Sequence, residues 1–353
     1  MSSLVNQPGS AGGDARPRVR APVFIIGSQR SGTTLLRVTL NRHSQLAVCG
    51  ETEFFRRLYT RRHAFGDPAN EQNRARIVSA YLAVRPVRQL GIDLSLLEER
   101  MMREGVNWSS IFASLLSAYA TTHGKPFAGE KTPGHAWHVH TLCEWYPDCA
   151  IIHLIRDPRA VVYSLTNVPW ASRSVLMGAR MWHSINTAAL AASKRDNYMA
   201  VKYEDLVARP EQELARICRH IGLDYEEALL EPIAGQRDPD KPFHPAYQKI
   251  TAGRAAVWQM RLHPWQIAAI EAAAGEYMDQ FGYQRHSAGA VASGKVRAVL
   301  EAFREMGLQK MLRLPCAFFR YFRPTRLADE ERWIAWASSM YARMRLQRQA
   351  GAL

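Results

Sequence analysis

Short apolar runs along the chain predict five β-strands. The runs occupy residues 23–26, 46–48, part of 125–133, 150–155 and 198–203. Consecutive apolar residues, in contrast to alternating apolar and polar ones, are typical of strands that are buried on both faces of a parallel sheet. The run at 150–155, with the sequence AIIHLI, is the clearest of the five.

Apolar residues at helical spacing separate these runs. They predict helices over residues 33–41, from 156 to 165, over 210–221 and over 264–281. Residues 56–122 are also largely helical in pattern. Strands that alternate with helices favour an α/β fold with a doubly wound, mostly parallel sheet and helices on both faces.

The length of 353 residues suits one large α/β domain with an appendage. Residues 1–20 are rich in Ser, Gly, Ala and Pro and contain no apolar core, so we expect a disordered leader and no signal peptide. The main domain is predicted over 21–286. Residues 287–353 are predicted to form a C-terminal helical extension, with helical patterns at 295–312 and 329–348.

Composition narrows the class of protein. A hydrophobic content of 47% with 22% charged residues is typical of a soluble globular chain, and no apolar run reaches the roughly 18 residues of a membrane span. The five cysteines are scattered and form no CxxC pair, so the sequence indicates neither a disulfide framework nor a structural zinc site. A reducing, cytoplasmic location is therefore predicted.

The net charge of +14 favours anionic partners such as nucleotides, acidic glycans or anionic lipids. Residues 288–353 contribute half of this charge, with 12 Lys or Arg against 5 Asp or Glu. Aromatic residues alternate with arginines at 312–323, which predicts contact of the tail with the acceptor or peripheral contact with an anionic membrane at its inner surface. A helix pair docked on the main domain is the alternative. Nucleic acid is not predicted, because no recognised nucleic-acid motif accompanies the charge.

The turn after the first strand has the pattern of a phosphate-binding loop. Gly27 and Gly32 enclose four residues, as in the nucleotide-binding motif GxxxxGK[ST], whose backbone N–H groups and helix N-terminus bind phosphate. Thr33 occupies the lysine position of that motif, and Arg30 offers a planar, permanently charged replacement. An ordinary strand–turn–helix, in which the glycines only permit the turn, is the alternative.

Charged residues follow two further strands. Glu51 and Glu53 come just after the second run, ahead of a Phe54-Phe55 pair, and Lys131 comes after the third. Ligands of open parallel sheets bind at the carboxyl ends of the strands, so these side chains are candidate site residues. Solvated surface positions are the alternative.

A fourth pair of candidates follows the run at 150–155. Arg156 stands at the strand end and Ser164 lies eight residues later, about two turns along the predicted helix. The two side chains converge on one phosphate only if that helix folds back over the strand end. A salt bridge between Arg156 and Asp157, or another carboxylate, is the alternative.

Together these four stretches resemble, over residues 22–283, the sulfotransferases that use 3′-phosphoadenosine 5′-phosphosulfate (PAPS). The shared elements are the loop RSGTTL at 30–35, ExxFF from Glu51, EKTP at 130–133 and RDP at 156–158 with Ser164. The resemblance implies a P-loop-like nucleotide-binding core. It also implies roles for individual residues: Arg30, Ser31, Gly32, Thr33 and Thr34 at the 5′-phosphosulfate, Arg156 and Ser164 with Arg254 at the 3′-phosphate, Glu51 as general base and Lys131 beside the transferring group.

The implied activity is transfer of a sulfuryl group from PAPS to a hydroxyl, or as second choice an amine, of a carbohydrate, lipid or other small-molecule acceptor. No metal is expected, because His135, His138 and His140 lack carboxylates or cysteines at ligand spacing. Two alternatives stay open. One is a nucleotide-dependent kinase, which Thr33 disfavours, and the other is a non-catalytic basic protein that binds nucleotide or a membrane surface.

Overall fold

The computed structural model describes residues 19–168, 171, 174–231 and 255–286. Its core is a five-stranded sheet in which all neighbouring strands are parallel, in the order β2-β3-β1-β4-β5. The strands are β1 (Val23–Gly27), β2 (Leu46–Cys49), β3 (Phe127–Lys131), β4 (Ala150–Ile155) and β5 (Tyr198–Lys202). All five strands that the apolar runs predict are present, and the α/β fold class is confirmed.

Helices fill the connections between the strands. In chain order the α-helices are α1 (Thr33–Leu40), α2 (Phe54–Arg57), α3 (Arg62–Phe65), α4 (Glu71–Leu82), α5 (Arg85–Arg88), α6 (Leu94–Glu104), α7 (Trp108–Thr122), α8 (Val139–Trp145), α9 (Pro158–Thr166), α10 (Val175–Leu190), α11 (Tyr203–Ala208), α12 (Pro210–Ile221), α13 (Trp258–Arg261), α14 (Pro264–Ala274) and α15 (Tyr277–Gln280). Short 3-10 helices are η1 (Tyr59–Arg61), η2 (Pro133–His138) and η3 (Glu227–Leu230).

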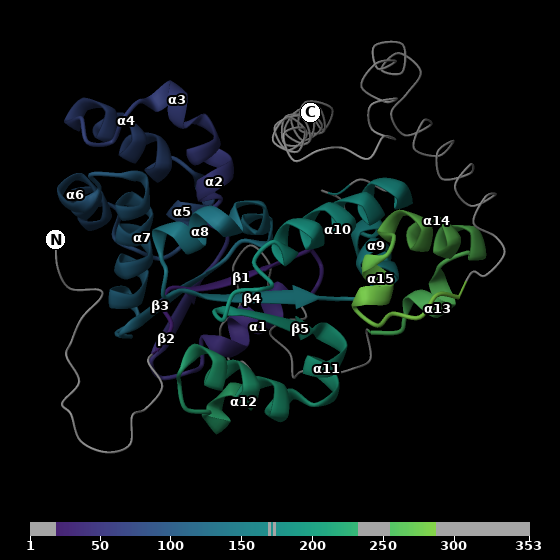
Figure 1. Cartoon of the computed structure of the whole chain (residues 1–353). Helices are drawn as coiled ribbons and strands as arrows, with labels where there is room; N and C mark the ends of the chain where they lie inside the picture. Colours follow the sequence, from purple (N-terminus) through teal and green to yellow (C-terminus); the bar gives the residue numbers. More distant parts are fainter. Residues whose placement is uncertain (1–18, 169–170, 172–173, 232–254, 287–353) are drawn as a thin grey trace, which may run out of the picture.

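Both faces of the sheet are covered, as the continuous apolar runs predict. Phe24 and Ile26 of β1 pack into one buried cluster with side chains of α7 and α8, whereas Val23 and Ile25 pack into another with α1 and α12. Figure 1 shows α7, α8 and α10 on one side of the strands and α1, α11 and α12 on the other. Each β1 side chain is thereby removed from water, which supplies the main stabilisation of a parallel sheet.

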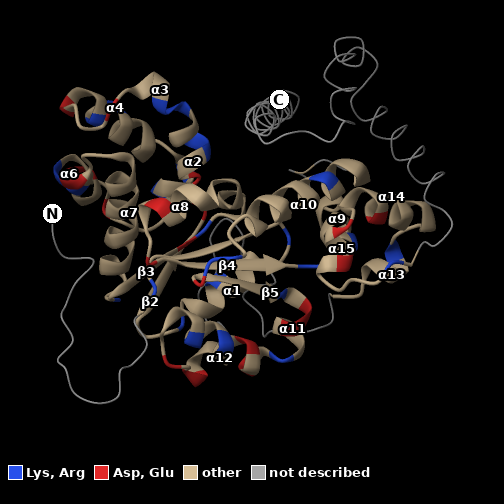
Figure 2. Ribbon diagram, viewed as in Figure 1, with Lys and Arg blue, Asp and Glu red and all other residues tan. Residues whose placement is uncertain are grey.

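The register of the strands places their carboxyl ends at one edge. Gly27 pairs with Leu154 of β4, Ile25 pairs with Lys131 of β3, and Cys49 of β2 pairs with Glu130 of β3. Figure 2 shows the strands largely without charged residues, while Lys, Arg, Asp and Glu occur on the helices and near strand ends. Charged residues that follow different strands therefore meet at this edge.

One predicted element differs. The sequence predicts a single helix over 264–281, but the structure ends α14 at Ala274 and begins α15 at Tyr277. Gly275 between them has a φ of 66°, a left-handed conformation that stops a helix and that glycine adopts readily. The predicted leader apart from residues 19–20, the extension at 287–353 and Arg254 lie outside the described residues.

Candidate active site

The loop between β1 and α1 has the backbone of an anion cradle. Gly27, Arg30 and Gly32 have φ values of 141°, 69° and 97°, and the N–H of Ser31 donates to the carbonyl oxygen of Ser28 at 3.1 Å, so the loop is a tight turn. Helix α1 begins directly after the loop at Thr33. Gly27 must be glycine here, because a Cβ would lie 2.3 Å from the carbonyl oxygen of Leu154.

Two further observations show that the loop suits an anionic group. Ser31 is fully buried, and its hydroxyl has no hydrogen-bond partner among the residues that the structure describes. A buried hydroxyl without a partner costs free energy unless a ligand binds it. At Gly32 a Cβ would meet the ring of Tyr203 at 2.5 Å, so this ring fixes how closely the loop approaches β5. The residues present therefore fit a phosphate or sulfate group.

Arg30, Ser164 and Arg156 come together at the mouth of the loop. The Nε of Arg30 donates a hydrogen bond of 2.9 Å to Ser164 Oγ, although 134 residues separate them. Nη1 of Arg156 donates to the carbonyl oxygen of Arg30 at 3.0 Å, and the Arg156 guanidinium lies 4.2 Å above the ring of Tyr203. Helix α9 thus folds back over the end of β4, which is the arrangement that convergence of Arg156 and Ser164 requires.

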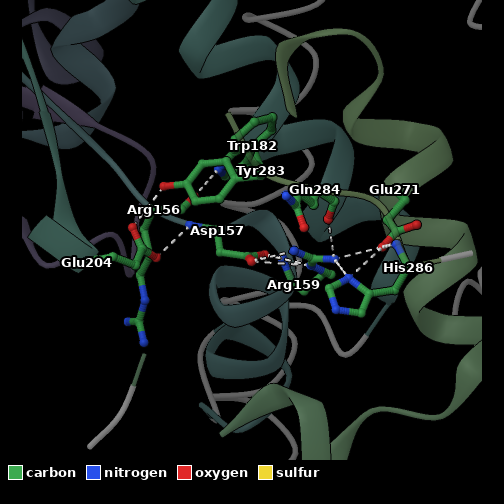
Figure 3. A network of polar contacts seen from close by, with 9 residues as sticks. All are labelled: Arg156, Asp157, Arg159, Trp182, Glu204, Glu271, Tyr283, Gln284 and His286. Atoms are coloured by element: carbon green, nitrogen blue, oxygen red, sulfur yellow. Dashed lines mark hydrogen bonds and ion pairs between the residues drawn. The ribbon is translucent and has the colours of Figure 1, made fainter. Parts of the chain in front are cut away.

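Asp157 follows Arg156, and its carboxylate binds Arg159. The Nη2 and Nε atoms of Arg159 donate to Asp157 at 2.7 and 2.9 Å, while Nη1 reaches Glu271 Oε1 at 2.8 Å and His286 Nδ1 at 2.7 Å. The guanidinium also lies 4.0 Å from the ring of Trp258. Figure 3 shows Arg159 at the centre of this network. The buried arginine therefore ties the turn after β4 to the segment that contains α13 and α14.

A second set of contacts holds the same turn from the side of β5. Glu204 Oε1 accepts from the N–H of Asp157 at 3.1 Å, and Tyr283 donates its hydroxyl to Glu204 Oε2 at 2.8 Å (Figure 3). Burial raises the pKa of Glu204 above its ordinary value, although both hydrogen bonds act to lower it. Trp182 Nε1 donates to the carbonyl oxygen of Arg156 at 2.9 Å. The backbone that carries Arg156 is thus fixed on both sides.

On the other side of β1, Lys131 and Glu51 form an ion pair. Lys131 Nζ lies 2.6 Å from Glu51 Oε1; Lys131 is the last residue of β3, and Glu51 follows the neighbouring strand β2. The lysine side chain is only 5% exposed, whereas that of Glu51 is 44% exposed. The lysine ammonium is therefore nearly buried at the carboxyl end of the sheet, and the Glu51 carboxylate is accessible to a molecule that arrives from solvent.

Glu53, the competing carboxylate, has a different environment. It begins α2 in a left-handed conformation with a φ of 54°, and its Oε2 pairs with Arg56 and, at 2.8 Å, with Arg57. Burial alone would raise the pKa of Glu53, but hydrogen bonds from both arginines outweigh it and hold the pKa below its ordinary value. A carboxylate engaged in this way is a weak proton acceptor.

Sequence reasoning missed the role of Glu130. This residue is 1% exposed, and its Oε1 accepts from Thr52 N at 3.2 Å, Thr52 Oγ1 at 3.0 Å and the hydroxyl of Thr132. Its other oxygen lies 3.0 Å from Nδ1 of the buried His135. The available signal was an acidic residue inside a strand pattern, directly before Lys131.

Two of the histidines after Lys131, His135 and His138, pack around this site, whereas His140 is exposed. His138 stacks on Phe55 with ring centroids 4.4 Å apart, and burial lowers the pKa of His138 to about 3. Within the described ranges, no three His, Cys, Asp or Glu side chains gather closely enough to hold a metal ion. In the same residues, no helix has the length and apolar character needed to cross a bilayer.

Comparison with known proteins agrees with this geometry. The model of the sulfotransferase family matches residues 22–227. The nodulation protein NoeE of Sinorhizobium fredii is 29% identical over 225 residues, which cover 57% of this chain and 50% of NoeE. Protein-tyrosine sulfotransferase 1 of Danio rerio is 26% identical over 225 residues, covering 59% of this chain and 55% of that protein. The chain thus spans about half the length of these two relatives.

Two solved structures share the fold. The sulfotransferase domain of the Synechococcus PCC 7002 olefin synthase superposes with a TM-score of 0.56 at 25% identity and covers 76% of this chain and 98% of that domain. The sulfotransferase domain from the curacin biosynthetic pathway gives a TM-score of 0.53 at 20% identity, with 76% and 100% coverage. Since the family model covers more than half of its residues, the chain belongs to the sulfotransferase family.

Proposed function

We propose that this chain uses PAPS as its donor and sulfates a hydroxyl, with an amine as second choice, on a carbohydrate, lipid or other small-molecule acceptor. The observation that carries the proposal is the pair of Lys131 and Glu51, 2.6 Å apart, at the strand edge that also carries the loop. A nearly buried cation beside an accessible carboxylate provides charge stabilisation and proton removal at one place.

The donor would be held by two groups of residues. Its sulfuryl group, activated by attachment to phosphate, is the group to be transferred. The 5′-phosphosulfate is assigned to Arg30, Ser31, Gly32, Thr33 and Thr34, where the start of α1 at Thr33 and the Ser31 hydroxyl, which has no partner among the described residues, support the assignment.

The 3′-phosphate is assigned to Arg156 and Ser164, whose contacts with Arg30 bring them to the mouth of the loop. Arg254 is assigned to the same phosphate by resemblance alone, since it lies outside the described residues.

Glu51 is assigned as the general base. An alcohol does not ionise at neutral pH, so a carboxylate within hydrogen-bond reach must take its proton as the new bond forms, a contribution of typically ~10²–10⁴ in rate. The exposure of Glu51 gives an acceptor access to it, whereas Glu53 is held by two arginines. Lys131 is assigned to the negative charge that develops during transfer, where a flexible ammonium is sufficient.

Kinetics of matched variants test these assignments. Glu51→Gln should keep its fold and its affinity for the product 3′-phosphoadenosine 5′-phosphate (PAP) while kcat falls by about 10²-fold or more. Glu53→Gln, two residues away, should change kcat far less. If Glu53→Gln loses the greater activity, Glu53 is the base, and if neither loses activity, the proton leaves by another route.

Nucleotide preference separates the proposal from a kinase. Calorimetry should show PAP binding more tightly than ATP, because Arg156 and Ser164 serve a 3′-phosphate that ATP lacks. A single charge-assisted hydrogen bond of this kind is worth about 1.5–3 kcal/mol. Equal affinity for nucleotides with and without a 3′-phosphate would remove both residues from the donor site.

The acceptor is the open part of the proposal. Relatives include protein-tyrosine sulfotransferases and, in Mycobacterium bovis, an omega-hydroxy-beta-dihydromenaquinone-9 sulfotransferase that is 25% identical over 173 residues. These names span a protein side chain and a lipid. Incubation of a cell extract with radiolabelled PAPS, followed by fractionation, should identify the labelled acceptor; if no fraction gains label, the non-catalytic alternative holds.

For the whole chain we propose a cytoplasmic enzyme whose sulfotransferase domain extends over 21–286. The basic residues of 287–353 are proposed to contact an anionic membrane peripherally, on the strength of their sequence alone. Co-sedimentation of the full chain and of a version ending at residue 287 with vesicles rich in anionic lipid tests this. Equal pelleting of the two proteins would leave the tail without a membrane role.

A further inference from the structure

A buried carboxylate connects the two turns that carry Glu51 and Lys131. Glu130 precedes Lys131 in β3, and its Oε1 accepts two hydrogen bonds from Thr52, the residue after Glu51. The same oxygen accepts from the hydroxyl of Thr132, the residue after Lys131. One oxygen atom thus contacts the chain neighbour of each residue in the ion pair.

We propose that Glu130 is a positioning residue that sets the distance between Glu51 and Lys131. The inference rests on the proposed function, because those two residues are its base and its cation. The ladder between β2 and β3 ends at the pair of Cys49 and Glu130, so no strand pairing fixes the Glu51 turn beyond that point. Beyond that pair, hydrogen bonds from Thr52 to the Glu130 side chain connect the two segments in place of backbone pairing.

The surroundings of Glu130 argue against simple space filling. The ring of its partner His135 packs edge-on against Phe55 and Phe112, with centroids 4.9 and 5.9 Å away, so this part of the core is otherwise apolar. Burying a carboxylate among apolar groups is costly unless hydrogen bonds satisfy it, and an apolar residue of similar size would pack there more favourably. The hydrogen bonds to Thr52 and Thr132 therefore point to alignment of the two turns.

The arrangement predicts that a small displacement of the Glu51 turn strongly lowers the rate of transfer. Thr52 is bonded through both its N–H and its hydroxyl, at 3.2 and 3.0 Å. Loss of the hydroxyl leaves a single bond between Thr52 and Glu130, and it also removes the acceptor of the Phe54 N–H at 3.4 Å, so the Glu51 turn can shift. A displacement of about 1 Å in a catalytic group can lower the rate by about 10²-fold.

Thr52→Val tests the proposal, because valine keeps the shape of threonine and deletes the hydroxyl. Initial rates would be measured with radiolabelled PAPS and the acceptor fraction from the extract, at a temperature where circular dichroism shows each variant to be folded. We expect kcat to fall about 10–100-fold while KM for PAPS and PAP affinity stay within about twofold. Thr52→Ser, which keeps the hydroxyl, should recover most of the rate.

Thr187→Val is the matched control. Its hydroxyl donates to the carbonyl oxygen of His183 at 2.8 Å within α10, so the change deletes an intrahelical bond of the same type. Its kcat should equal that of the wild type. Glu130→Met is the second variant: it deletes the oxygen that accepts from Thr52 and Thr132, so it should lower kcat and leave KM for PAPS unchanged, whereas Glu130→Gln keeps an acceptor oxygen and should retain more of the rate.

The outcomes separate the two proposals. If wild type is active and Glu51→Gln is not, but Thr52→Val has wild-type kcat, the positioning role of Glu130 is refuted and the proposed function stands. If kcat falls equally in Thr52→Val and Thr52→Ser, the positioning role of Glu130 is also refuted, because the Thr52 hydroxyl would then have no effect on kcat. If the wild type transfers no label at all, the proposed function itself fails.

Discussion

Replacement of Arg159 by methionine should strongly destabilise the protein. Arg159 is 2% exposed, and its guanidinium is shared between Asp157 and Glu271, whose side chains are 9% and 1% exposed. Methionine fills a similar volume but leaves both carboxylates buried without their cation. Removing one partner of a buried ion pair typically costs about 3–5 kcal/mol, because the remaining charge is uncompensated.

Chemical unfolding in guanidinium chloride measures this loss. A decrease of about 3–5 kcal/mol in the free energy of unfolding should also lower Tm by about 10 °C. Arg209→Met is the matched control: Arg209 pairs with Asp205 at 2.9 Å, but the two side chains are 56% and 40% exposed, so its loss should cost less than about 1 kcal/mol.

A double variant tests the cause. Adding Glu271→Gln to Arg159→Met removes one unpaired carboxylate and should therefore recover part of the lost stability. If the two substitutions instead destabilise additively, Glu271 and Arg159 are not coupled. If Arg159→Met is no less stable than Arg209→Met, the network does not hold the turn after β4 in place.

Three further predictions follow from burial and backbone geometry. Burial lowers the pKa of His138 to about 3 and of His153 to about 4, below their unfolded value of 6.5. The free energy of unfolding therefore loses nothing from these two histidines above pH 6.5, and it decreases as the pH falls below that value. The slope is up to ~1.4 kcal/mol per pH unit for each histidine, and urea unfolding of His153→Gln should show a smaller slope. Gly32→Ala should weaken PAP binding in calorimetry by about tenfold or more, because strain at its positive φ adds to a clash with the ring beneath the loop. Gly124→Ala, at a positive φ with open space around it, should leave PAP affinity unchanged. The pKa of Glu53 is lowered, so its ion pairs stabilise the fold above the unfolded pKa and are lost as the pH falls; Glu53→Gln should therefore destabilise near pH ~7 and not near pH ~3.

The sequence predicts the strands well because all are short and β1, β2 and β4 are nearly continuous apolar runs, although β3 (FAGEK) and β5 (YMAVK) also contain charged residues. The same runs bring Glu51 and Lys131 together, since residues that follow parallel strands meet at one edge and these two strands are neighbours. The break at Gly275 was missed because the apolar spacing continues across it, and only the left-handed backbone reveals the end of α14.

The contacts of Arg156 and Arg159 were beyond sequence reasoning for a different reason. The alternative for Arg156 was a salt bridge with the adjacent Asp157, but that carboxylate binds Arg159. The other partners of Arg159 lie 112 to 127 residues away in sequence. No local pattern encodes such pairs, which depend on how α9 and α14 pack in three dimensions.

The strand order explains how a phosphate-binding loop can work without a lysine of its own. Thr33 is buried at the lysine position, and β1, which carries the loop, lies between β3 and β4. The residues that follow those strands therefore place Lys131 on one side of the loop and Arg156 on the other. A lysine inside the loop would serve the donor alone. From the end of β3, Lys131 also contacts Glu51, which follows β2, so in the proposed function the cation beside the donor and the base for the acceptor are directly linked. That linkage gives Glu130, between the two turns, its influence on the rate.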